Sequence, residues 1–282
     1  MERMARDRTG FETNDHGEPK RWSLALALDA QRGDIMPALN ALVFARLEGR
    51  FDDRAFLASI VGPACPPEVL QRAGELMPRA PEPCILHAAH LLGRARSETE
   101  LCIAIAHLVS AARIDDADPT PHALRVGVAH LLGAPTDGRI AFRDAVARDP
   151  LNHYAYRAMV RLLSQGYRGS HTEALQVARH ASAIAPIGSD LHGCLFEAHV
   201  EVWRSMRYGD ESAAHAYLES EYVRHELDVA FDTWLADDYR PRLGSGPGLG
   251  AAALWYFQTG DEDRLHQVRT IIREAEAALR AA

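Results

Sequence analysis

Apolar positions along this chain recur mostly at helical spacing, which predicts an all-α protein. The pattern begins at Trp22, and residues 37–47 are apolar on all but one narrow face. Further helices are predicted over 55–61 and 67–77, with Gly62-Pro63 as a break between them. No segment alternates apolar and polar residues for long enough to indicate a β-sheet.

The last third of the chain predicts a second helical region. Residues 209–236 indicate one long helix that is charged on one side, and residues 264–280 indicate a terminal helix capped by Thr259 or Asp261. The glycine-rich segment 241–250 lacks the preceding strand and the Gly-Lys-Ser/Thr of a phosphate-binding loop. It is therefore expected to be a flexible connection or a lid.

The middle of the chain contains a weak internal repeat. Ala89-His90-Leu91-Leu92-Gly93 recurs as Ala129-His130-Leu131-Leu132-Gly133, forty residues later. The second copy is followed by another helical stretch and then by Asp149-Pro150. Pro119, Pro150 and Pro186 follow one another at spacings of 31 and 36 residues, as expected where proline ends each helical hairpin. The order helix, turn, helix, Asp-Pro predicts stacked helical hairpins.

Residues 121–186 resemble two degenerate tetratricopeptide repeats, whose period is about 34 residues. The matching small, aromatic and proline positions are Ala129, Phe142, Ala145 and Pro150 in the first unit, and Tyr156, Ala174, Ala181 and Pro186 in the second. Val160 and Arg125 depart from the pattern. The resemblance implies a right-handed stack of about six helical hairpins, followed by a long C-terminal helix region.

The sequence pattern and the repeat resemblance together predict an N-terminal arm and one domain. Residues 1–20 are polar and charged, and we expect them to form a mobile N-terminal arm. Residues 21–282 are expected to form a single helical-repeat domain, with a repeat core over about 81–207 and C-terminal helices over 209–282. Ser170 is expected to cap the helix that starts at His171, with Glu173 in its first turn.

Charge and composition narrow the classes of partner. The 282 residues carry a formal net charge of −8, which argues against a general nucleic-acid or anionic-membrane binder. The sequence contains no secretory signal and no apolar stretch of about 18 residues, so we expect no membrane span. None of the four cysteines forms a C-x-x-C pair. Together these features favour a cytoplasmic protein.

The resemblance also implies a concave groove lined by the first helix of each hairpin. The side chains that its register places there are His90 and Arg94 from the first unit, His130 from the second, Tyr154, Arg157 and Arg161 from the third, and Glu197 and Glu201 from the fourth. Two arginines one turn apart can clamp a carboxylate or a phosphate. The alternative is that Arg157 and Arg161 pair with Glu197 or Glu201 and only join neighbouring helices.

The leading functional prediction is therefore a tetratricopeptide-like binding or scaffold protein. It would hold a peptide or protein segment, acidic segments included, in the groove and would need no cofactor. The sequence leaves open whether the groove is accessible or is plugged by the N-terminal arm or by the helix over 209–236.

Two other readings stay open. The first is an enzyme, metal-dependent in one form, with a cavity between the repeats and the C-terminal helices. Its candidate ligands for a divalent metal are Glu197, His199, His215, Glu219 and His225. Carboxylates with Glu-x-x-His pairs hold metals in helical bundles, but that spacing is missing here, so solvated helix faces are the competing explanation. The second is self-assembly through Trp255-Tyr256-Phe257, unless these rings pack on the preceding helix.

Overall fold

The computed structural model describes residues 18–164, 170–236 and 239–281, and this part of the chain is helical, with no β-strand. Its helices are α1 (Glu18–Gln31), α2 (Met36–Leu47), α3 (Phe51–Ala64), α4 (Pro67–Leu76), α5 (Glu82–Arg94), α6 (Glu98–Ile114), α7 (Thr120–Leu132), α8 (Pro135–Val146), α9 (His153–Leu163), α10 (His171–Ile184), the 3-10 helix η1 (Asp190–His192), α11 (Gly193–Gly209), α12 (Glu211–Glu219), α13 (Glu221–Trp234), α14 (Gly246–Thr259) and α15 (Glu262–Ala281). The predicted all-α class is confirmed.

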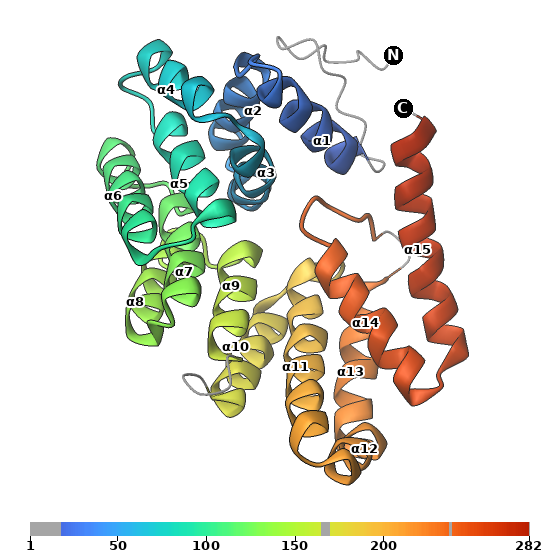
Figure 1. The fold of residues 1–282 in the computed structure, drawn as a ribbon. Helices are drawn as coiled ribbons and strands as arrows, with labels where there is room; N and C mark the ends of the chain where they lie inside the picture. Colours follow the sequence, from blue (N-terminus) through green and yellow to red (C-terminus); the bar gives the residue numbers. More distant parts are fainter. Residues whose placement is uncertain (1–17, 165–169, 237–238, 282) are drawn as a thin grey trace.

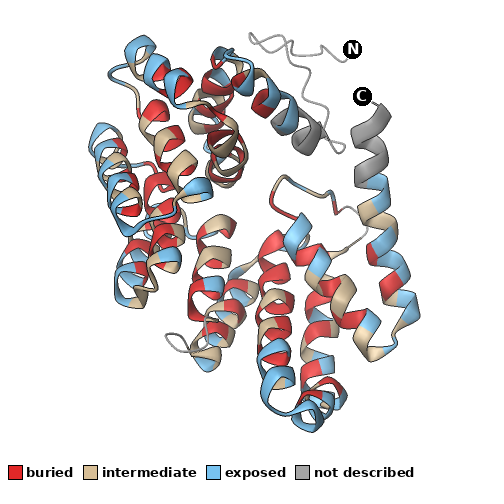
Figure 2. Ribbon diagram, in the orientation of Figure 1, coloured by how far each residue is buried: buried red, intermediate tan, exposed pale blue. Residues whose placement is uncertain are grey.

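The helices follow one another around an arc (Figure 1). α5 packs on α3, α6 and α7, α7 packs on α8 and α9, and α9 packs on α10 and α11. The C-terminal helices continue this order, because α11 packs on α12 and α14, and α14 packs on α15. α1 and α15 are also in contact, so the first and the last helix meet. Buried residues lie on the helix faces that meet neighbouring helices, and exposed residues lie on the outer faces (Figure 2).

Small residues allow the middle helices to approach closely. A Cβ atom at Gly138 would lie 2.1 Å from Leu162 Cδ2, so a larger residue there would displace the Leu162 side chain where α8 crosses α9. The ring of Phe142 on α8 meets the ring of Tyr156 on α9 edge to face, with centroids 5.0 Å apart. Ala145 is fully buried in the same region. Phe142, Ala145 and Tyr156 are three of the residues that the resemblance predicts at packing positions, and they lie in the contact between the helices.

The Gly62-Pro63 pair does not break the chain, because α3 continues through it to Ala64. Proline lies in the last turn, and glycine provides the close approach to α5. A Cβ atom at Gly62 would lie 2.7 Å from the Cβ of Ala89, and one at Gly93 would lie 2.3 Å from Pro63. The first Ala-His-Leu-Leu-Gly segment therefore packs its small residues on the end of α3.

The single long helix predicted over 209–236 is wrong. α11 extends to Gly209, and the following residues form two helices, α12 and α13, that are separated at Ser220. Ser220 has φ −60° and ψ 113°, which is an extended conformation. The Asp210 carboxylate accepts hydrogen bonds from the N–H groups of Ser212 and Ala213 and so caps α12. The helical spacing of apolar residues continues across Ser220, which explains the error.

Two other boundaries differ from the prediction. The segment 241–250 is not a loop throughout, because α14 begins at Gly246 with Pro247 in its first turn. α1 begins at Glu18, inside the range 1–20 predicted for the arm, and residues 1–17 lie outside the described part of the chain. Asp261 rather than Thr259 caps α15, with its carboxylate 3.1 Å from the N–H of Arg264.

A buried ion network joins the first half of the arc. Arg54 on α3 is fully buried and donates hydrogen bonds to Glu82 on α5, at 2.9 Å, and to Asp118. Arg46 also donates to Glu82, at 2.9 Å. The second Asp118 oxygen accepts the N–H of Thr120 at the start of α7, 2.9 Å away. Buried charges persist only when paired, so this network fixes how α3, α5 and α7 sit together.

Candidate functional site

Four of the predicted groove residues line one small pocket. His130 on α7 and Tyr154, Arg157 and Arg161 on α9 surround it, together with Gly127 and Ala158. Its volume is about 50 Å³. A water molecule needs about 10–15 Å³ of such space, so the pocket accepts a few waters or one small polar group. It does not accept the width of a peptide backbone.

The three basic side chains around this pocket differ in the net charge that they contribute. The Nε of Arg157 lies 3.0 Å from both carboxylate oxygens of Glu197 on α11, so this pair is close to neutral. Burial and the nearby Arg161 lower the pKa of His130, and the His130 ring bonds to the Arg161 backbone, which only partly offsets this effect. His130 is therefore neutral at pH 7. Arg161 is exposed and supplies the net positive charge.

Two residues of α3 contact Tyr154 and so hold one side of the pocket in place. The Asp52 carboxylate accepts the backbone N–H of Tyr154 at 3.0 Å, near the N-terminus of α9. The ring of Phe56 meets the Tyr154 ring edge to face, with centroids 5.0 Å apart. Burial outweighs the hydrogen bonds that Asp52 accepts and raises its pKa to about 7. Sequence reasoning missed both residues, because α3 lies outside the recognisable repeats and about a hundred positions from Tyr154.

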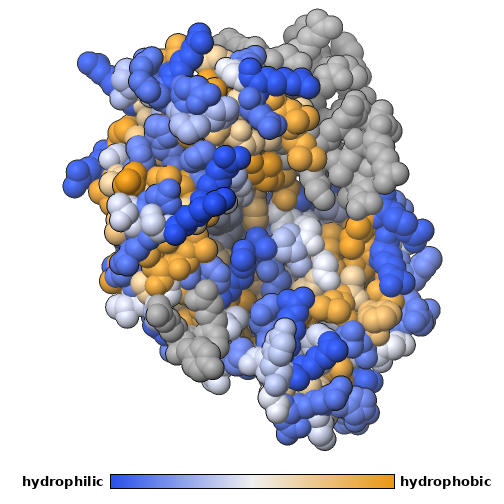
Figure 3. All heavy atoms as spheres, viewed as in Figure 1, coloured by the Kyte–Doolittle hydropathy of each residue, from blue (hydrophilic) through white to orange (hydrophobic). Residues whose placement is uncertain are grey.

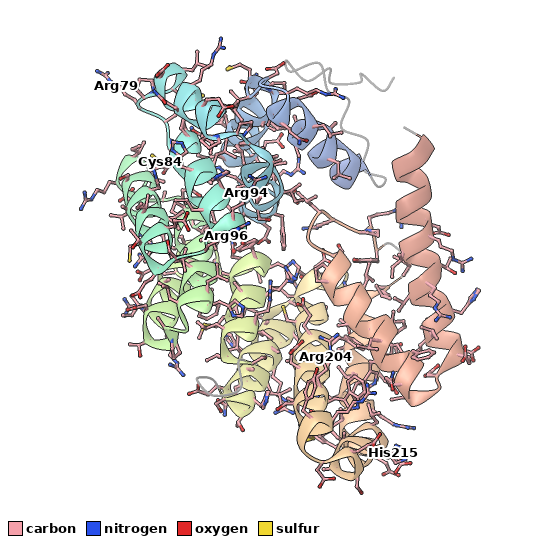
Figure 4. The ribbon with its side chains drawn as sticks, viewed as in Figure 1. Arg79, Cys84, Arg94, Arg96, Arg204 and His215 are labelled. Atoms are coloured by element: carbon pink, nitrogen blue, oxygen red, sulfur yellow. The ribbon has the colours of Figure 1, made fainter. Side chains whose placement is uncertain are left out.

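The other predicted groove residues lie elsewhere. His90 donates from Nδ1 to the Gly62 carbonyl at 3.1 Å. The same carbonyl also accepts the backbone N–H of Cys65 at 3.1 Å, so His90 adds a second hydrogen bond at the end of α3. Arg94, labelled in Figure 4, lies in the last turn of α5 and is exposed. Glu201 on α11 pairs with Arg204 at 2.6 Å.

A segment from the C-terminal region occupies the inner side of the arc. Gly244 lies against the Phe56 ring, where a Cβ atom would be only 2.1 Å from Cε2. The segment is anchored by Asp190, whose carboxylate accepts hydrogen bonds from Tyr239 at 2.7 Å, Ser245 at 2.8 Å and Trp234 at 3.1 Å. The middle of the face seen in Figure 3 is recessed. Gly244, rather than a residue of α12 or α13, therefore lies against α3 at this point. The predicted plug by the arm concerns residues 1–17, which lie outside the described chain.

The candidate metal ligands do not converge. His199 is buried and bonded to Tyr217 and Glu226, and Glu197 is bonded to Arg157. His215 pairs with Glu219 at 3.3 Å on the exposed side of α12, at the far end of the molecule (Figure 4). His225 is exposed on α13. Within residues 18–164, 170–236 and 239–281, no three His, Cys, Asp or Glu side chains are grouped to hold a metal ion.

The aromatic run of the last hairpin is mostly internal. Trp255 and Tyr256 are 2% and 1% exposed, while Phe257 is 59% exposed. Tyr256 packs edge to face on Phe231 of α13, with centroids 5.0 Å apart. Two of the three rings therefore stabilise the packing of α14 on α13 and α11, and only Phe257 is available to another molecule.

Two further observations bear on the class of protein. Among the described residues, no helix combines the length and the apolar character needed to cross a bilayer. Comparison with models of protein families and with curated proteins finds no match for this sequence.

Proposed function

We propose that this protein is a tetratricopeptide-like binding module that captures an acidic side chain of a peptide or protein partner. The observation that carries the proposal is the shared pocket of His130, Tyr154, Arg157 and Arg161. A right-handed stack of hairpins would place this pocket on the concave side of α7 and α9. The proposal is supported by the neighbour order of the helices and by the edge-to-face contact of Phe142 with Tyr156.

The pocket's chemistry favours a carboxylate. Arg161 provides an exposed guanidinium, which donates several hydrogen bonds in one plane and retains its charge. Glu197 holds the guanidinium of Arg157 in place beside Arg161, because the Nε of Arg157 donates to both carboxylate oxygens of Glu197. Tyr154 offers an apolar ring beside these donors. The small volume limits the captured group to a side chain, so the rest of the partner would lie across α7 and α9.

The test is a binding assay with a fluorescein-labelled peptide of alternating glutamate and serine. We expect Arg161→Ala to weaken binding by about tenfold or more, since a hydrogen bond to a charged group contributes about 1.5–3 kcal/mol. The control is Arg143→Ala on α8, whose side chain is 74% exposed and does not line the pocket. A second peptide with glutamine in place of glutamate should bind weakly to every variant.

The two variants separate a site from general charge attraction. If Arg143→Ala and Arg161→Ala reduce binding equally, the acidic peptide is held by the overall surface charge and the proposed pocket is wrong. If neither peptide binds the unmodified protein, the proposed class of partner is wrong. Binding at the pocket should also weaken as salt is raised from 0.05 to 0.5 M, conditions chosen to span the usual range of screening.

A further inference from the structure

A second pocket lies at the junction of α10, α11 and α12, away from the Arg161 pocket. Its volume is about 460 Å³, which is within the range of about 300–1,000 Å³ typical of small-molecule sites. Much of its wall is apolar, formed by Leu175, Val202, Met206, Ala213 and the Tyr217 ring, and Asp210 lies at one side. The proposed acidic partner does not use this space.

Tyr217 connects the pocket to a buried hydrogen-bond relay. Its hydroxyl lies 2.6 Å from Nδ1 of His199, and Nε2 of His199 lies 3.0 Å from Glu226. Arg179 donates to both oxygens of Glu226, at 2.7 and 2.9 Å. One residue from each of the helices α10, α11, α12 and α13 therefore takes part in this relay. Burying such a network is costly unless each polar group in it has a hydrogen-bond partner. The relay ends at Tyr217, which also lines the pocket.

The carboxylate of Glu226 fixes the direction of the hydrogen bond that it shares with His199. Burial alone would raise the pKa of Glu226, but hydrogen bonds from His199 and Arg179 outweigh it and lower the pKa to about 2. Glu226 is therefore an acceptor only, and His199 must donate to it from Nε2. Nδ1 of His199 and the Tyr217 hydroxyl share a hydrogen bond, and whichever of the two donates, the Tyr217 oxygen keeps a lone pair. Burial raises the pKa of Tyr217, which keeps this hydroxyl protonated at pH 7.

The hydrogen-bond acceptors beside the pocket indicate which kind of ligand it binds. The Tyr217 oxygen can therefore still accept a hydrogen bond from a molecule in the pocket. The carboxylate of Asp210 caps α12 and adds a second acceptor group beside the pocket. We infer that the pocket at α10, α11 and α12 binds a small apolar molecule that carries a hydroxyl or N–H donor, and that Tyr217 receives this donor.

The test uses two probes that differ only in the donor: 4-propylphenol and its methyl ether, 4-propylanisole. Isothermal titration calorimetry measures both dissociation constants. We expect the unmodified protein to bind the phenol about fivefold more tightly, as one net hydrogen bond of about 0.5–1.5 kcal/mol provides. Tyr217→Phe keeps the ring and removes the hydroxyl, so both probes should then bind with the affinity of the ether.

A matched pair of variants locates the binding. Ala213 and Ala216 are both exposed on α12, but only Ala213 lines the pocket. Ala213→Trp should abolish binding of both probes, and Ala216→Trp should leave both unchanged. Because these positions are on the surface, the pair remains informative even if Tyr217→Phe lowers the stability. Equal binding of phenol and ether to the unmodified protein, no binding of either, or equal effects of the two tryptophan variants would each overturn the inference.

Discussion

Arg157 on α9 places its Nε 3.0 Å from both carboxylate oxygens of Glu197 on α11, and this pair lies between the candidate pocket and the core. Burial raises the pKa of Glu197 while the Arg157 charge and hydrogen bonds lower it, with a net increase. Loss of Arg157 would leave Glu197 without its partner. We predict that Arg157→Ala lowers the free energy of unfolding by about 2 kcal/mol, measured by urea denaturation.

The neighbouring arginine should behave differently. Because Arg161 is exposed, Arg161→Ala should change the free energy of unfolding by less than about 0.5 kcal/mol. Adding Glu197→Gln to Arg157→Ala should recover part of the lost stability. If Arg161→Ala is as destabilising as Arg157→Ala, both arginines join the helices and the binding role loses its support.

The buried ion network predicts a severe folding defect. Arg54→Met would leave the fully buried carboxylates of Glu82 and Asp118 without their shared cation, which should cost about 3–5 kcal/mol. The control is Arg50→Met just before α3, since Arg50 is 43% exposed and its pairs should contribute less than about 1 kcal/mol. Urea denaturation compares the two. The triple variant Arg54→Met, Glu82→Gln, Asp118→Asn should recover much of the loss, and a mild effect of Arg54→Met alone would contradict the assigned role.

Asp52 predicts a stability difference that depends on pH. Burial raises its pKa from 3.8 to about 7, so between about pH 4 and 7 the folded state holds a proton that the unfolded state releases. Its contribution to stability therefore falls as pH rises through that window. Asp52→Asn removes this titration. As pH rises through the window, the free energy of unfolding of the variant should therefore increase relative to that of the unmodified protein, by up to about 1.4 kcal/mol per pH unit.

The measurement is urea denaturation of both proteins at pH 4.5, 6 and 8. Asp53→Asn removes a carboxyl from the same helical turn and provides the control. A difference between Asp52→Asn and the unmodified protein that is constant across these pH values would show that the carboxyl of Asp52 does not titrate in this window.

Two glycines of α14 should respond in opposite directions to alanine. A Cβ atom at Gly248 would lie 2.9 Å from Cη2 of Trp234 and 3.2 Å from the Cα of Gly193. Gly248→Ala should therefore cost about 1–3 kcal/mol through overpacking. No atom lies within 4 Å of a Cβ at Gly250, so Gly250→Ala should stabilise the helix by up to about 1 kcal/mol. Thermal denaturation compares them, and a neutral Gly248→Ala would contradict the close crossing of α11 and α14.

Local sequence signals were sufficient where the controlling contacts are local. The Ser170 cap is confirmed, because its hydroxyl accepts the N–H of Glu173 at 3.3 Å, and both residues are visible in one short motif. The break at Ser220 was missed although Asp210 and Ser220 are both residues that often precede helices. Apolar spacing dominated that interpretation, and the spacing does not change across the break.

Contacts between distant segments could not be predicted in the same way. The repeat register brought Arg157 and Arg161 to one surface, since both lie on α9. It did not show that His90 would bond to the Gly62 carbonyl, or that Asp52 would hold the start of α9. These depend on how α3 packs on later helices, and no local pattern specifies that arrangement.

The contact between α1 and α15 changes how the whole array should unfold. In an open row of hairpins, each unit depends only on its neighbours, and the ends fray first. Here the two ends share an interface, so neither is a free terminus of the row. Opening that interface would expose α1 and α15 together, and the chain's first and last helices should lose their amide protection as one unit.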